Sequence, residues 1–552
     1  MLDKLQNLYP EMTLLAAACT VMILGLSRTA ALRRLCWVVA GAALASAGVL
    51  AYFTTGPASH ALPNLPLYGK VLTAGIGMLL LLLVAGTADR QYEARVAGGA
   101  VAFDPLHSTR GEFYAFFLFS LAGVMLCCGA DDLIWLFLAL ELVSLPTYIM
   151  VATSTARNRS MEAAVKYFFL GAMGAAIFLY GFALIYGATG ATGFAQIKFA
   201  FGAQMEAGGG AAGLNPIGVI GIIMALIGIG FKIAAAPMHF YAADVYQGAS
   251  ASIAGFLAFV PKTAGFVAIM LLLSTLAWTL DSGTGLVTLP PAINATLWIM
   301  AVATMTIGNV MALLQSSVKR ILAYSSIAHS GYMLVGIIAG PGEPGTLAGS
   351  GLAATLYYLL VYGVMNLGAF AVVACLQKPA AGMGRGTNQG AGADAGALIE
   401  IDALDDIRGL CATHPFLGWI MVLCSASMLG LPPLLGFFGK LPLFSAGITA
   451  GQITLVVIMG LNSAIGAVYY LRLAAYPLLE QPDPAGMSSR VTQTPVSGRW
   501  LAGVLSAAGV VVLAVVPLTG FAKFGARYTP HVFGGGNPST RAAAAETPVA
   551  QK

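Results

Sequence analysis

Four ionisable side chains lie inside sequence runs that are otherwise almost wholly apolar. Glu141 is the only acid in LIWLFLALELVSLPTYIMVA, and Lys232 ends the run IGVIGIIMALIGIGFK. Lys262 follows Pro261 in ASIAGFLAFVPKTAGFVAIML, and Lys440 lies in LPPLLGFFGKLPLF. A charge at the centre of a bilayer costs roughly 2.5–3.5 kcal/mol, so residues of this kind indicate a functional interior or a water-filled path. Loss of hydration and nearby cations both favour the neutral form of a lysine, which suits the set to loading and releasing protons.

Two histidines, His239 and His329, also lie in apolar surroundings. A histidine titrates near neutral pH, so each is a candidate proton relay, and each is also explained as a hydrogen-bonded packing residue. The acid and the lysines likewise have a structural explanation, as buried ion pairs or as lysines that extend toward the membrane surface. One acid against three lysines leaves an uneven pairing, which favours proton handling. No HxxxH pair or carboxylate pair accompanies the histidines, so we expect no metal site.

The composition requires a lipid environment for these residues. Of the 552 residues, 58% are hydrophobic and 9% are charged, whereas a soluble protein carries roughly 25% charged residues. Apolar runs of about 20 residues, the length of a membrane-spanning helix, recur along most of the chain. The alternating pattern of barrel strands is absent. The sequence therefore predicts an all-α polytopic membrane protein with the lipid bilayer as its surroundings.

The charge and cysteine content exclude other classes. The net charge is only +5, and no basic stripe with interleaved aromatic residues occurs, so we expect no nucleic-acid partner. The seven cysteines lie in or beside apolar segments, and no CxxC occurs. We interpret the cysteines as small packing residues, with a metal or disulfide role as the alternative.

The apolar runs predict fourteen transmembrane helices, at approximately residues 12–27, 35–54, 70–88, 113–130, 133–152, 165–187, 216–247, 250–276, 293–315, 321–340, 352–376, 415–447, 452–475 and 499–520. The first is read as an uncleaved helix, because Asp3, Lys4 and Glu11 make a poor positive segment for a signal peptide.

The basic residues test this count through the positive-inside rule for short loops. With the N-terminus outside, the outside loops hold three basic residues, Lys4, Lys70 and Lys198. The inside loops hold seventeen: Arg28, Arg33, Arg34, Arg90, Arg95, Arg110, Arg157, Arg159, Lys166, Lys319, Arg320, Lys378, Arg385, Arg408, Arg472, Arg490 and Arg499. One missed or invented span would disrupt this 17 to 3 split, so the count of fourteen is self-consistent. An even number of spans with the N-terminus outside places the C-terminus outside as well.

Two of the spans are overlong and contain prolines that break a helix. Pro237 follows Lys232 in the seventh span, and Pro432 and Pro433 precede Lys440 in the twelfth. Each break falls on the fourth helix of a five-helix unit, the first over residues 113–276 and the second over 293–475. Five is an odd number, so the second unit enters the membrane from the opposite side. Matching breaks in two inverted repeats indicate a transporter site with two half-channels.

The remaining segments are assigned by position and composition. Residues 1–112 form an N-terminal three-helix segment, and residues 499–520 form the last transmembrane helix. Residues 377–400, rich in Gly and Ala, and residues 534–552 are predicted to be flexible. The stretch GRGTNQG in the first of these lacks the spacing and the preceding strand of a dinucleotide fingerprint.

Four segments of the sequence carry a family resemblance: LELVSLPTYIMVA, FKIAAAPMHFYAADVYQGASASIAGFLAFVPK, LLQSSVKRILAYSSIAHSGYMLVG and LGLPPLLGFFGKLPLF. They resemble the antiporter-like membrane subunits of respiratory complex I over roughly residues 105–480. Among these, DVYQGA with FFGKLPLF is similar to the subunit N family of bacterial NADH-quinone oxidoreductase, the counterpart of mitochondrial subunit 2. The chain departs from the family at Ala249-Ser250, where Ala-Pro is frequent, and in its Gly-rich loop and long C-terminal tail.

The resemblance implies a proton-pumping translocase subunit in the bacterial cell inner membrane. It matches Glu141 to the family's acid of the fifth helix and Lys232 to its partner lysine on the broken seventh. Lys262 matches the connecting lysine of the eighth helix, and Lys440 matches the terminal lysine of the broken twelfth. Other membrane-arm subunits of complex I are the implied partners. NAD, FMN, iron–sulfur clusters and quinone are expected in other subunits, and no cofactor is expected in this chain.

Two other functions fit parts of the sequence. An Mrp-type cation/proton antiporter subunit would share the buried lysines and the broken helices. A structural membrane scaffold is the second alternative, and the desolvation cost of the lysines argues against it. The sequence itself does not exclude Na⁺ as the transported ion.

Overall fold

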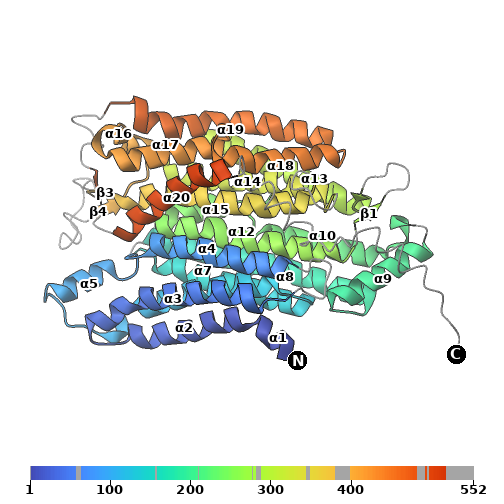
Figure 1. The fold of residues 1–552 in the computed structure, drawn as a ribbon, viewed down its shortest axis with the longest axis horizontal. Coiled ribbons are helices and arrows are strands. Elements are labelled where there is room, and N and C mark those ends of the chain that lie inside the picture. The colour runs from blue at the N-terminus through green and yellow to red at the C-terminus, as the bar shows by residue number, and fades with distance from the viewer. Residues whose placement is uncertain are drawn as a thin grey trace.

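The computed structural model describes residues 2–56, 64–155, 158–208, 210–276, 278–280, 287–342, 349–379, 398–481, 491–493 and 497–516. In this part of the chain the long helices lie side by side with their axes roughly aligned (Figure 1). Eleven of them are long and apolar enough to cross a membrane, and three shorter apolar helices, Tyr9–Gly25, Pro216–Gly230 and Pro415–Leu429, occupy the remaining expected spans. Together they account for all fourteen predicted spans, so the all-α polytopic fold is confirmed.

The N-terminal segment precedes the two five-helix units. It contains α1 (Leu2–Asn7), α2 (Tyr9–Gly25), α3 (Ala30–Thr54), α4 (Leu65–Val84), α5 (Arg90–Ala97) and the 3-10 helix η1 (Pro105–His107). Prolines lie in the first turns of α2 and α4, where the missing N–H has no helical partner in any case.

The first unit has five spans, of which the fourth is broken. Its elements are α6 (Arg110–Cys128), α7 (Leu133–Thr153), α8 (Asn158–Thr189), α9 (Phe194–Ala207), η2 (Ala211–Gly213), α10 (Pro216–Gly230), α11 (Ala242–Gly248) and α12 (Ala251–Ser274). The half-helices α10 and α11 make up the broken span. An antiparallel pair of short strands, β1 (Thr279–Leu280) and β2 (Val287–Thr288), leads to the second unit.

The second unit repeats this order of spans. Its elements are α13 (Pro291–Leu313), α14 (Val318–Ala339), α15 (Gly351–Cys375), β3 (Leu376–Pro379), β4 (Leu398–Glu400), η3 (Leu404–Ile407), α16 (Leu410–Thr413), α17 (Pro415–Leu429), α18 (Leu435–Thr449) and α19 (Ile453–Leu479). Here α17 and α18 make up the broken span. The chain continues through β5 (Thr492–Gln493) to α20 (Ser497–Val516), and the sheet order is β4-β3-β5 with antiparallel neighbours.

The core of the bundle lies at the junction of the two units. Every residue of α12 is buried, and almost every residue of α14 and α15 is buried. Helix α12 packs against α6 and α7 of the first unit and against α14 and α15 of the second. The outer helices expose large apolar side chains instead, such as Phe53, Phe169 and Leu479, as expected for surfaces that face lipid.

The connecting segments gather at the two ends of the bundle in the alternation that the topology predicts. We call the end with the predicted inside loops the inner end; it carries α5, β3, β4 and α16, while α9 and β1 lie at the opposite, outer end (Figure 1). Contacts within each end agree with this. At the inner end Arg33 pairs with Glu93 at 2.7 Å, and at the outer end Asp132 forms an isolated bridge with Gly193.

Of the two segments predicted to be flexible, the structure describes only the two ends of the first. Strands β3 and β4 include both ends of the predicted loop 377–400 and pair with each other, so these ends are ordered by a β-ladder. Residues 380–397 and the predicted flexible tail 534–552 lie outside the described residues.

Candidate functional site

Glu141 and Lys232 form an ion pair within the first unit, as the sequence predicts. Helix α7 presents Glu141, and Lys232 lies in the turn that separates α10 from α11. The lysine Nζ donates to a carboxylate oxygen of Glu141 at 3.0 Å and also to Ser144 Oγ one turn further along α7. The Lys232 side chain is 2% exposed and that of Glu141 is 20% exposed. An opposite charge at this distance stabilises the protonated lysine.

The segment around Lys232 is not helical, yet its backbone still finds hydrogen-bond partners. Pro237 has no N–H and cannot continue α10. The neighbouring Ala236 N–H donates to Thr304 Oγ1 at 2.8 Å, and the Tyr241 hydroxyl donates to the Phe231 carbonyl at 2.8 Å. Non-helical backbone at membrane depth is tolerated where protein surrounds it. Side chains from both units supply that surrounding here.

Lys262 joins the two units. Its Nζ donates to the backbone carbonyl of Ser326 on α14 and lies 5.2 Å from the centre of the Tyr362 ring. The lysine is 1% exposed. Among the described residues it has no carboxylate within salt-bridge distance. A carbonyl and an aromatic face stabilise an ammonium less than a carboxylate does, so Lys262 is held by weaker partners than Lys232.

A serine connects the neighbourhoods of these two lysines. Ser330 Oγ donates to the carbonyl of Ile233, the residue after Lys232, at 2.6 Å. The same Oγ lies 3.3 Å from the Ser326 carbonyl that accepts from Lys262. The break in the first unit and the buried lysine of α12 therefore share one hydrogen-bonded group on α14.

His329 lies between Lys262 and Lys440. Its Nδ1 is 2.5 Å from the Tyr358 hydroxyl and its Nε2 is 2.6 Å from the Tyr470 hydroxyl. Its ring packs against Tyr362, which also faces Lys262, and against Tyr332, which also faces Lys440. Both ring nitrogens thus have hydroxyl partners that can donate or accept.

Lys440 occupies the break of the second unit. Pro432 and Pro433 lie between α17 and α18, and Lys440 is in the second turn of α18. Its Nζ donates at 3.0 Å to the carbonyl of Leu429, the last residue of α17. The final carbonyls of a helix have no helical partner and carry its negative dipole end. The cation therefore caps the half-helix, and no carboxylate pairs with it among the described residues.

We call Glu141, Lys232, Lys262, His329 and Lys440 the polar row. The structure brings these five predicted residues together across both units. His239 is different: its ring packs against Phe240, and among the described residues no hydrogen bond joins it to the polar row.

Reasoning from the sequence missed the hydroxyl groups that connect the polar row. The motif AYSSIAHSG places Ser325, Ser326, His329 and Ser330 at helical spacing on one helix, which is a signal that was available. The tyrosines Tyr358 and Tyr470 come from distant helices, and their contacts with His329 have no local signature.

A second buried acid–lysine pair was also missed. Lys70, assigned to an outside loop from the sequence, lies within α4 and is 2% exposed. It pairs with Glu11 of α2 at 2.8 Å and donates to the Asn7 carbonyl. The physical reason for the error is that α4 begins at Leu65, before the strongly apolar run. The pair ties the first helices together at the outer end.

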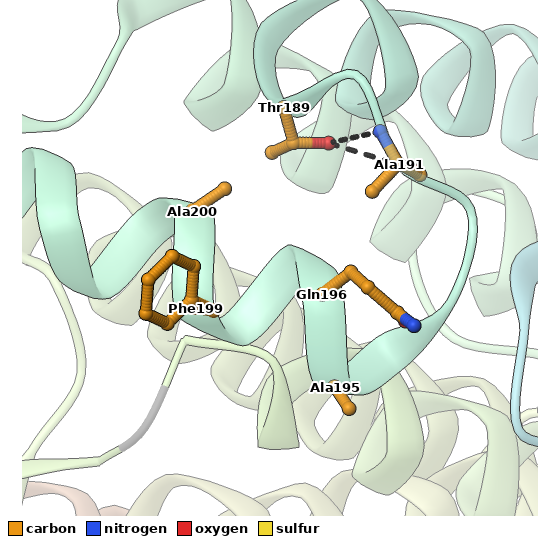
Figure 2. A pocket seen from close by; sticks show the side chains of 6 residues that line it. All are labelled: Thr189, Ala191, Ala195, Gln196, Phe199 and Ala200. Atoms are coloured by element: carbon orange, nitrogen blue, oxygen red, sulfur yellow. Dashed lines mark hydrogen bonds between the residues drawn. The ribbon is translucent and has the colours of Figure 1, made fainter.

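Two open pockets lie away from the polar row. The one in Figure 2 is lined by Thr189, Ala191, Ala195, Gln196, Phe199 and Ala200, where α8 ends and α9 begins. A second, adjoining pocket adds Asp131 and Asp132 to the same region. Within the described residues, no group of three or more His, Cys, Asp or Glu side chains could hold a metal ion.

Comparisons with known proteins agree with the fold. The family model described as NADH:quinone oxidoreductase/Mrp antiporter, TM, matches residues 130–466. NADH-quinone oxidoreductase subunit N of Trichlorobacter lovleyi is 39% identical over 445 residues, which are 80% of each chain. A chain of respiratory complex I from Thermus thermophilus with bound aureothin is 28% identical, with a TM-score of 0.65, over 92% of this chain and 98% of that one.

A chain of the Mrp complex from Dietzia sp. DQ12-45-1b has a TM-score of 0.71 over 99% of both chains, at 18% identity. At this identity the likeness shows the fold alone. The apolar helices, the transmembrane family and the bacterial relatives together make this a multi-pass protein of the bacterial inner membrane. On these grounds, the chain belongs to the NADH-quinone oxidoreductase subunit N family of antiporter-like membrane proteins.

Proposed function

We propose that this chain is a proton-translocating membrane-arm subunit of NADH-quinone oxidoreductase and that the polar row carries the protons. The observation that carries the proposal is the arrangement of the row. Titratable groups occupy the break of each unit, and a buried lysine on α12 and a buried histidine on α14 lie between the two breaks.

The chemistry of the row supports proton transfer. Glu141 holds a proton on Lys232, and a change in the distance between the two groups would release it. Lys262, His329 and Lys440 have neutral partners, so each gains or loses a proton without leaving a buried anion unpaired. We infer that protons enter from the cytoplasm near Lys232 or Lys262 and leave outward through Lys440.

The redox chemistry belongs elsewhere in this proposal. NADH oxidation and quinone reduction take place on other subunits, which hold the flavin, the iron–sulfur clusters and the quinone, and the enzyme class is a translocase. The partners are the other membrane-arm subunits. The division into an N-terminal segment, two inverted units and a last helix, with both termini outside, is part of the same proposal, and labelling of Asn388→Cys from the cytoplasmic side alone would support that orientation.

The test compares proton transfer driven by NADH with exchange driven by a cation gradient. The purified complex is placed in vesicles, and acidification is followed during NADH-dependent quinone reduction. A Lys262→Met variant should reduce the protons pumped per quinone, because it removes the buried titratable group at the junction of the units. Sodium-driven proton exchange without NADH that Lys262→Met abolishes would favour the Mrp-type antiporter instead. Wild-type pumping by Lys262→Met would refute the role of the row.

A further inference from the structure

A short acidic segment crosses the inner end of the bundle where the two units meet. We call residues Glu400 to Leu404 the latch. Its backbone is fixed to the second unit, because the Val318 N–H donates to the Asp402 carbonyl at 2.6 Å and the Leu404 N–H donates to the Ser316 carbonyl at 2.9 Å. The latch is therefore attached to the start of α14.

Glu400 extends from the latch to the first unit. Its Oε2 accepts from the N–H of Ala251, the first residue of α12, at 2.8 Å. The same oxygen lies 3.2 Å from Lys319 Nζ at the start of α14, and this lysine also donates to the Ala249 carbonyl at 2.9 Å. A carboxylate at a helix N-terminus satisfies a free N–H and complements the helix dipole. Glu400 and Lys319 thus clamp the start of α12 to the start of α14.

Asp402 makes the equivalent link to α11. One of its carboxylate oxygens accepts from Gln247 Nε2 at 2.7 Å, and the other accepts from Ser317 Oγ. The amide oxygen of Gln247 accepts in turn from Arg320, which pairs with Asp244 at 2.8 Å. The second half of the broken helix is therefore held to the same end of α14.

The helices that the latch joins are the ones that Lys262 joins deeper in the membrane. Lys262 lies eleven residues along α12 from Ala251, and Ser326 lies nine residues along α14 from Ser317. At 1.5 Å per residue these are about 16 and 14 Å, so Lys262 and Ser326 lie at nearly the same depth below the latch. A helix transmits a shift along its axis, because its hydrogen bonds resist stretching. A different hold of the latch on the two helix ends would therefore move Lys262 Nζ relative to the Ser326 carbonyl.

Helix α11 also contributes a side chain near Ser326, the residue whose carbonyl accepts from Lys262. The hydroxyl of Tyr246 lies 3.5 Å from Ser326 Oγ, and the Tyr362 hydroxyl donates to that Oγ at 2.7 Å. Each of the helices held by the latch thus contributes a group at Lys262 or at its acceptor residue.

We propose that Glu400 is a positioning residue for proton transfer through Lys262, acting through the latch that fixes α11 and α12 against α14. The inference rests on the proposed function, since it assigns Glu400 to the proton path of Lys262. Glu400 itself lies too far from the polar row to exchange protons with it directly.

The test uses the whole complex in vesicles, four single variants and one double variant. Glu400→Ala removes both the cap and the ion pair, whereas Glu400→Gln keeps an oxygen for the Ala251 N–H. Asp405→Asn is the matched control, because Asp405 is a neighbouring acid that is 71% exposed and bonds only Arg408 among the described residues. Complex content, quinone reduction and protons pumped per quinone are measured for each, and for Lys262→Met.

We expect Glu400→Ala to lower pumping by about tenfold, the effect of losing a charged hydrogen-bond partner, and Glu400→Gln to recover part of it. Asp405→Asn should pump as the wild type does. The double variant Glu400→Ala with Lys262→Met should lose no more than Lys262→Met alone, because Glu400 acts through Lys262. Losses that add in the double variant, or normal pumping by both Glu400 variants, would overturn the inference. If Lys262→Met itself pumps normally, the proposed function has failed instead.

Discussion

Replacement of Lys440 by arginine tests whether this residue acts only as a fixed positive charge or also as a proton carrier. The Lys440 ammonium contacts the Leu429 carbonyl and the Tyr332 ring, and a guanidinium can make both kinds of contact. The charge at the end of α17 is then retained, and the complex should assemble. An arginine does not release its proton at any working pH.

The size of the effect follows from the ordinary pKa values of the two side chains. The guanidinium has the higher pKa, so at any working pH the neutral form of arginine is roughly a thousandfold rarer than that of lysine. Proton release through this position should fall by about that factor. Lys440→Met should also stop release, and it leaves the Leu429 carbonyl without its donor, which costs about 1–2 kcal/mol of stability.

The assay follows quinone reduction and vesicle acidification together for wild type, Lys440→Arg and Lys440→Met. Lys166→Arg is the matched control, because Lys166 is 47% exposed on α8 and pairs with Glu162 there. The control should pump normally. If Lys440→Arg pumps protons at the wild-type rate, Lys440 is a fixed charge and the reasoning about the polar row is wrong at this position.

Three further predictions concern the ion pairs. Glu141→Gln should lower pumping while the complex still assembles, with Glu141→Asp milder because it keeps the charge; normal pumping by Glu141→Gln at matched content would make the pair structural. Lys70→Leu should cost about 3–5 kcal/mol of stability because Glu11 is left unpaired, whereas the double variant with Glu11→Leu should lie near wild type in thermal unfolding. The two hydrogen bonds from Arg33 hold the pKa of Glu93 below its usual range. Wild type should therefore be more stable than Glu93→Gln above about pH 4.3, and this advantage should disappear as the pH falls through the folded-state pKa; an advantage unchanged at pH 3 would contradict it.

The fold was predictable because each span carries its own signal. Apolar length marks a helix wherever it lies, and Pro237 and Pro432 mark the breaks, since proline acts on its own backbone. Lys70 was misassigned for the opposite reason. Its helix starts before the strongly apolar run, and its partner Glu11 is 59 residues away in sequence. A burial that depends on a distant partner has no local signature.

The candidate site also contains residues with a local sequence signal and residues without one. The buried charges are visible in the sequence because each is an exception within an apolar run. The tyrosines that flank His329 are ordinary aromatic residues in apolar helices, and only the packing of α14, α15 and α19 shows that Tyr358 and Tyr470 reach the imidazole. His239 shows that an apolar neighbourhood in the sequence is not enough to locate a residue. The folded chain places its ring against Phe240 and not in the polar row.

The partners of the buried lysines differ between the two units. Lys232 has a carboxylate at 3.0 Å, whereas Lys440 has a helix carbonyl and an aromatic ring. In the same buried surroundings, an ion pair stabilises an ammonium more than these neutral partners do. If the row carries protons as proposed, Lys232 holds its proton more firmly than Lys440 does. Opening the Glu141–Lys232 contact removes the stronger hold, and transfer toward Lys440 then becomes favourable. In the proposed function, this difference between two otherwise similar units distinguishes the entry side of the row from its exit side, and quinone reduction supplies the energy that drives transfer between them.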